Sequence, residues 1–154
     1  MRNRCIILIF IAAVLSSCSK PADRFEFRYT PDEWQDTSAF RFCMTLDEPE
    51  TSYSTRIACR FNAGTIGADA IPVLITVTSP AGDNFSETID LPVTASSDLI
   101  RTRRAGGPVV DIDWPYRDRI VPGQDTGVWQ VAIRPIKKTM AGSIYGMGLS
   151  YKRK

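Results

Sequence analysis

From residue 24 onward, apolar and polar residues alternate with a period of two, and no other feature constrains the fold of this chain as strongly. Phe25, Phe27 and Tyr29 alternate with charged residues. Comparable strand-like segments follow at 40–46, 56–61, 71–79, 85–93, 109–116, 127–134 and 144–152. Behind the leader, no segment keeps a 3.6-residue apolar period, and only 137–142 is expected to form one helical turn. The pattern therefore predicts an all-β protein.

About eight strands joined by short Gly, Pro and Asp turns predict a single antiparallel two-sheet β-sandwich, with a jelly-roll-like arrangement. The aromatic stripes of the strands are expected to supply the inner faces of both sheets. Residues 96–107 form the longest irregular stretch and are expected to be a mobile loop. Nothing divides residues 24–154, so we expect one domain there.

The first residues have the pattern of an export signal. Arg2 and Arg4 precede an apolar run at 6–15, which is too short to cross a hydrocarbon layer of about 30 Å. Leu15-Ser16-Ser17-Cys18 follows and resembles the lipobox of bacterial lipoproteins. The resemblance implies that residues 1–17 are removed and that Cys18 carries a diacylglycerol and an N-acyl chain. The alternative is an ordinary secretory signal with a chance cysteine.

Such an anchor predicts a location in the cell envelope. Each buried methylene contributes roughly 0.8 kcal/mol, so two or three acyl chains hold a protein on a membrane where one chain does not. Residues 18–23 are then the lipidated cysteine and a short tether. Some surface-displayed lipoproteins carry an acidic run behind the cysteine, whereas this chain has Ser19-Lys20. We therefore expect the domain to face the periplasm from the outer membrane.

Composition excludes several classes of function. The chain has 19 Lys and Arg against 17 Asp and Glu, and loss of Arg2 and Arg4 with the leader makes these numbers equal. No general attraction to nucleic acid follows. The chain also has no histidine, so the commonest general base and transition-metal ligand are missing. No catalytic residue, metal or cofactor is predicted besides the covalent lipid.

Cys43 and Cys59 lie on neighbouring predicted strands. If these strands form an antiparallel hairpin, the two cysteines face each other across it and are close enough for a disulfide. The alternative is two buried free thiols, which pack as small apolar side chains.

Two other constellations have a structural and a functional interpretation. Asp111 and Asp113 share one face of a strand. Paired carboxylates can act as acid and base at glycosidic bonds or bind calcium, but two carboxylates two residues apart on a strand are more typical of a solvated sheet face. Trp34 and Trp114 could stack on sugar rings, as in carbohydrate-binding sandwiches, although core packing is the favoured interpretation for tryptophans here. Trp129 alternates with Val131 and Ile133 and is expected in the core.

Arg101, Arg103 and Arg104, followed by Gly106-Gly107, form a basic segment. They lack the glycine spacing and the following helix of a phosphate-binding loop. We consider them either a solvated loop or a contact site for a partner.

A set of aromatic, glycine and strand positions extends along the mature chain: Trp34, 40–42, Tyr53, 57–62, 78–82, 127–133, Met140 and 144–149. Through these positions the chain resembles the gliding-motility lipoprotein GldH family of Bacteroidota. The resemblance implies a non-enzymatic outer-membrane lipoprotein that supports gliding motility through contacts with envelope proteins of the motility or secretion machinery. The alternative is a carbohydrate-binding lipoprotein of a glycan-uptake system, with Trp34 and Trp114 as its stacking residues.

Overall fold

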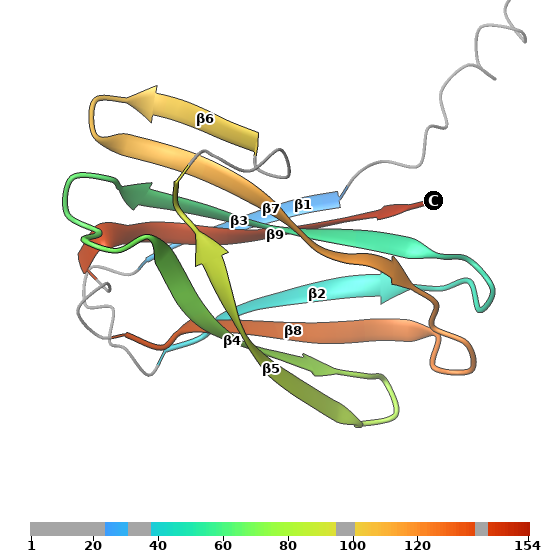
Figure 1. The fold of residues 1–154 in the computed structure, drawn as a ribbon. Helices are drawn as coiled ribbons and strands as arrows, with labels where there is room; N and C mark the ends of the chain where they lie inside the picture. The colour runs from blue at the N-terminus through green and yellow to red at the C-terminus, as the bar shows by residue number, and fades with distance from the viewer. Residues whose placement is uncertain (1–23, 31–37, 95–100, 138–141) are drawn as a thin grey trace, which may run out of the picture.

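The computed structural model describes residues 24–30, 38–94, 101–137 and 142–154, with 101–105 described by their backbone alone. Within these residues two antiparallel sheets face each other as a sandwich (Figure 1). Sheet A has the strand order β1-β9-β3-β7-β6, and sheet B has the order β2-β8-β4-β5. The strands are β1 (Arg24–Tyr29), β2 (Phe40–Leu46), β3 (Tyr53–Asn62), β4 (Ala70–Thr78), β5 (Asn84–Pro92), β6 (Arg101–Gly106), β7 (Val109–Ile120), β8 (Gly127–Pro135) and β9 (Ile144–Arg153). The predicted all-β sandwich is confirmed.

Every segment that was expected to be a strand is one, and β6 is an additional strand. The expected mobile loop is therefore wrong for residues 101–106, which pair with β7 through a turn at Gly107 and Pro108 that follows Gly106, the last residue of β6. These glycines have φ values of 133° and 54°, which favour residues without a Cβ. The sequence of β6 is polar and lacks the apolar alternation by which the other strands were predicted. It forms a strand nevertheless, because backbone hydrogen bonds to its one neighbour, β7, stabilise it. Residues 95–100, and most of the expected helical turn at 137–142, lie outside the described residues.

Strands that follow each other in sequence mostly belong to different sheets. Among the described strands, only β4–β5 and β6–β7 pair with their immediate successor. The expected hairpin between the strands of Cys43 and Cys59 is wrong, because β2 pairs with β8 and β3 pairs with β7 and β9.

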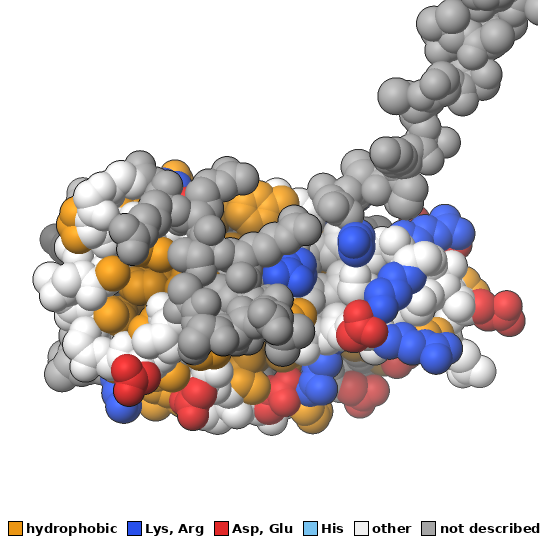
Figure 2. All heavy atoms as spheres, turned by 45° about the horizontal axis from the view of Figure 1, so that its top comes forward, with side chains coloured by type: hydrophobic (Ala, Val, Ile, Leu, Met, Phe, Trp, Pro, Cys, Tyr) orange, Lys and Arg blue, Asp and Glu red, His pale blue; other side chains and the backbone are white. Residues whose placement is uncertain are grey.

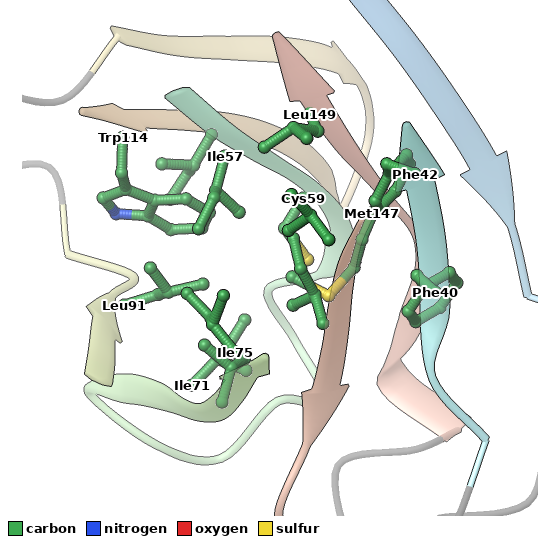
Figure 3. Close-up of a cluster of buried hydrophobic side chains, with 14 of the residues drawn as sticks. Phe40, Phe42, Ile57, Cys59, Ile71, Ile75, Leu91, Trp114, Met147 and Leu149 are labelled. Atoms are coloured by element: carbon green, nitrogen blue, oxygen red, sulfur yellow. The ribbon is translucent and has the colours of Figure 1, made fainter. Parts of the chain in front are cut away.

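The core lies between the sheets and is made mainly by alternate residues of β2, β3, β4, β7, β8 and β9, with Leu91 of β5 (Figure 3). Ile57, Cys59 and Met147 of sheet A face Phe42 and Ile75 of sheet B, and each is at most 2% exposed. Burial of a large apolar side chain contributes about 1.5–3 kcal/mol, so this layer is the main source of stability.

The two ends of the domain lie together. Arg24 is opposite Tyr151 in the β1–β9 ladder, and the C-terminus is close to the start of β1 in Figure 1. In the described part of the chain, no helix has the length and apolarity needed to span a membrane.

Candidate functional site

The outer face of sheet A carries aromatic side chains that were expected in the core. Phe25 and Tyr29 are 60% and 66% exposed, and Phe27 lies half-buried between them. The guanidinium of Arg28 lies 5.9 Å from the ring centre of Phe42 in sheet B, on the opposite side of β1. The inward orientation predicted for these aromatic residues is therefore wrong. We call Phe25, Phe27 and Tyr29 the aromatic stripe.

Two glycines explain this orientation. In the β1–β9 ladder, Phe27 lies opposite Gly148 and Tyr29 lies opposite Gly146. A Cβ at Gly146 would come within 2.5 Å of the Phe27 ring, and one at Gly148 within 2.8 Å. The Phe27 ring therefore fills the space that side chains of β9 would otherwise occupy. Glycines two residues apart in strand β9 are the sequence signal that could have identified the outer face.

The middle of the same face carries two Arg–Asp ion pairs. Arg60 binds Asp111 through two parallel hydrogen bonds, Nε to Oδ1 at 2.7 Å and Nη2 to Oδ2 at 2.8 Å. Arg56 Nε donates to Oδ2 of Asp113 at 2.7 Å. The hydrogen bond to Asp111 raises the pKa of Arg60 above its ordinary value. Arg56, Arg60, Asp111 and Asp113 form what we call the ionic patch.

The ionic patch agrees with the expectation that Asp111 and Asp113 lie on a solvated sheet face. Ile112 and Trp114, between and after them, point into the core and are 1% and 4% exposed. Arg60 also links the patch to the aromatic stripe, because its guanidinium lies 6.0 Å from the Phe27 ring centre and Nη1 donates to the Tyr29 hydroxyl at 3.4 Å. The alternation of β3 predicted these outward arginines, but only the strand pairing identified their partners.

The ladder of β6 brings the predicted basic segment to this face. Arg101 lies opposite Asp113 and Arg103 lies opposite Asp111 in the β6–β7 ladder, whereas Arg104 lies opposite Val110. Because directly opposed residues of an antiparallel pair share a face, the positions of Arg101 and Arg103 border the ionic patch. The backbone of β6 pairs with β7 and forms the edge of sheet A.

Trp114 is buried, and its Nε1 donates to the Pro92 carbonyl at 2.9 Å. This position is incompatible with stacking of Trp114 on a sugar ring and corrects that part of the carbohydrate alternative. Trp34 lies outside the described residues. Trp129 packs against the core, as expected.

The predicted disulfide is also corrected. Cys43 and Cys59 are free cysteines, and Cys43 is exposed whereas Cys59 is 1% exposed. Cys43 lies opposite Gln130 in sheet B, and Cys59 lies between Ile112 and Met147 in sheet A. The expected disulfide depended on a hairpin between β2 and β3 that would place the cysteines opposite each other, and these strands belong to different sheets. Burial raises the pKa of the Cys59 thiol.

A groove of about 510 Å³ separates the edges of β1 and β2. Phe42, Leu149 and Tyr151 form part of its lining, together with Arg24 and Glu26. The Tyr151 hydroxyl accepts a hydrogen bond from the Thr45 backbone N–H at 3.0 Å, a group on the edge strand of sheet B. The groove thus separates two strand edges that are adjacent in space but do not pair.

Cys18 and its tether precede the described residues, so the lipidation of Cys18 stays a prediction. Within the described ranges, no group of three or more His, Cys, Asp or Glu side chains is arranged to hold a metal ion. A scan against models of known protein families found no match, and a search of curated proteins found none either.

Proposed function

We propose that the protein is a lipid-anchored, non-enzymatic envelope lipoprotein of the GldH type, which supports gliding motility or associated envelope machinery by binding other envelope proteins. The lipobox-like sequence ending at Cys18 supports the anchor, and the resemblance along the mature chain supports the role. Confinement by the anchor raises the effective concentration of the domain near membrane-bound partners.

The observation that carries the binding role is the position of β6. An edge strand offers backbone groups to which an extended segment of another protein can add. The backbone positions of Arg101 and Arg103 lie opposite Asp113 and Asp111 of the ionic patch, so the sequence of this edge suits a partner with acidic side chains. Arginine is enriched in protein interfaces because its planar guanidinium binds carboxylates with two hydrogen bonds. Charged residues on an edge strand also oppose aggregation, which is the structural alternative.

Chemical crosslinking of the acylated protein in its native envelope tests this assignment. Replacing both Arg101 and Arg103 by glutamine should weaken crosslinks to a specific envelope protein about tenfold, equivalent to about 1.4 kcal/mol. The matched control replaces Arg41 and Arg134 of sheet B by glutamine, which changes the net charge equally. Unchanged crosslinks in the first variant, or equal losses in both, would exclude β6 as the contact.

The periplasm-facing orientation on the outer membrane is part of the proposal and rests on Ser19-Lys20 behind the lipid. External protease on intact cells should leave the protein uncut, and digestion should require lysis. Rapid digestion of the protein on unlysed cells would instead place the domain on the surface.

We also assign the sandwich to the jelly-roll class. With β6 set aside as an added edge strand, the strand orders β1-β9-β3-β7 and β2-β8-β4-β5 support this assignment, since each sheet alternates early and late strands.

A further inference from the structure

We propose that the aromatic stripe docks on the bilayer that holds the lipid anchor, so that β1 lies in the headgroup layer. This inference rests on the proposed acylation of Cys18. It assigns an occupant to an exposed apolar surface that the binding role at β6 does not use.

The length of the tether limits where β1 can lie. Arg24 follows Cys18 by six residues, and an extended chain spans at most about 3.6 Å per residue, or about 20 Å in total. The aromatic stripe begins at the next residue, Phe25. The acyl chains therefore hold the start of this strand, together with the end of β9 beside it, within reach of the membrane surface.

The side chains of the stripe suit the interface between water and hydrocarbon. Tyrosine combines an apolar ring with a polar hydroxyl and is enriched at membrane surfaces, and phenylalanine buries its ring at the acyl boundary. The Phe27 ring centre lies 6.2 Å from that of Phe25 and 5.1 Å from that of Tyr29. The three rings thus form one continuous surface. Phe27 packs against sheet A because Gly146 and Gly148 leave room for its ring.

Charge near the tether is compatible with a bilayer that contains anionic lipids. Figure 2 shows Lys and Arg side chains gathered toward the end at which Figure 1 marks the C-terminus, with acidic side chains among them. Arg153 forms an ion pair with Glu48, and Lys154 forms one with Asp118 at 2.6 Å. We therefore expect the aromatic rings, more than the net charge, to bind the domain to the bilayer.

The same geometry leaves the proposed contact edge free. β1 and β6 are the two edges of sheet A, separated by four strand-to-strand steps. At about 4.8 Å per step, β6 is about 19 Å away from β1 across the sheet. The backbone edge of β6 is therefore separate from the strand that docks.

Photocrosslinking of the full chain in cells tests the docking. p-Benzoyl-phenylalanine replaces Phe25, Tyr29 or, as a matched control, Phe85, which is 52% exposed but belongs to β5 of sheet B. After irradiation, mass spectrometry of the purified protein identifies phospholipid or protein adducts. Labelled palmitate in a parallel culture reports acylation of Cys18.

We expect phospholipid adducts at positions 25 and 29 in at least tenfold greater yield than at 85. Acylated protein with equal yields at the three positions, or with protein adducts instead of lipid adducts at 25 and 29, would overturn the docking and leave the anchor intact. Absence of palmitate on Cys18 would overturn the anchor and the docking with it.

Discussion

At the scale of single residues, Gly146 and Gly148 decide which face of β1 carries its aromatic rings. The rings cover β9 from outside because no Cβ stands there, and Arg28 consequently points toward sheet B. Cys59 shows a complementary effect, since its small side chain packs in the core between Ile112 and Met147 and does not form the disulfide that was expected with Cys43.

Gly146→Ala should destabilise the protein by about 1–3 kcal/mol, because the new Cβ would lie 2.6 Å from the Arg28 carbonyl oxygen, a backbone atom that cannot rotate away. Urea unfolding measures the loss. Gly142→Ala is the matched control, since its new methyl group would meet no atom within 4 Å, and its effect should stay below about 0.5 kcal/mol. Equal unfolding midpoints for the two variants would contradict the packing of Phe27 on Gly146.

A thiol reagent should modify Cys43 in the native protein and should modify Cys59 only after denaturation. Cys43 is exposed, whereas burial both shields Cys59 and raises its pKa, which disfavours the reactive thiolate. Peptide mapping after alkylation without reductant measures both sites. A Cys43–Cys59 peptide joined by a disulfide would contradict the structure.

At the scale of elements, a side-chain hydrogen bond links β7 of sheet A to β5, the edge strand of sheet B. The register of β7 with β3 shifts between Thr55 and Arg56, so that one extra residue, Tyr116, is accommodated. The buried Thr55 hydroxyl accepts a hydrogen bond from the Arg117 N–H at 3.1 Å at this irregularity. Tyr116 donates to Oε1 of Glu87 on β5 at 2.7 Å. A bulge in one sheet thereby provides a polar link to the other.

Tyr116→Phe should reduce the loss of stability at alkaline pH. Burial, and Glu87 beside it, raise the pKa of Tyr116 above its ordinary value of 10.0. Below that pH the hydroxyl is protonated in both states. Above it the unfolded state loses its proton first, so the free energy of unfolding falls by up to about 1.4 kcal/mol per pH unit until the folded group also titrates.

Urea unfolding of both proteins between about pH 8 and pH 11 measures this difference. The variant should be about 1 kcal/mol less stable near pH 8, because Glu87 loses one donor, and its stability should fall less steeply above pH 10. The raised pKa of Cys59 contributes equally to both proteins. Identical slopes would show that Tyr116 titrates alike in the folded and unfolded states.

At the scale of the whole molecule, the outer face of sheet A extends between two edge strands, β1 and β6, that differ in character. The aromatic stripe lies at the β1 edge, the ionic patch lies in the middle, and β6 forms the other edge. The start of β1 and the end of β9 lie together, so the proposed anchor at Cys18 would hold the domain by one edge of this sheet. The proposed anchor and the proposed contact strand are therefore separated by the width of the sheet.

Cys18→Ala should move the protein from the membrane fraction to the soluble fraction and abolish its function, because the acyl chains are the proposed anchor. The folded domain should survive, since the core between sheets A and B lies wholly behind the tether. Fractionation, urea unfolding and a motility assay measure the three effects. Full function of the soluble variant would contradict the proposed mechanism.

The class of fold and every described strand except β6 could be predicted from the amino-acid sequence alone. Period-two alternation depends on neighbours along the chain, so segments such as 40–46 and 127–134 could be identified without knowledge of their partners. The same local information predicted that Asp111 and Asp113 share a solvated face and that Trp129 packs against the core.

Which strands pair, and which face of an edge strand is covered, could not be predicted from the sequence and became known from the three-dimensional structure. Cys43 and Cys59 lie apart because the consecutive strands β2 and β3 belong to different sheets. Residues 101–106 form a strand because their backbone pairs with β7. The aromatic stripe turned outward because β9 presented glycines to it. Alternation distinguishes two faces of a strand, but contacts between residues far apart in sequence determine which of the two becomes the core.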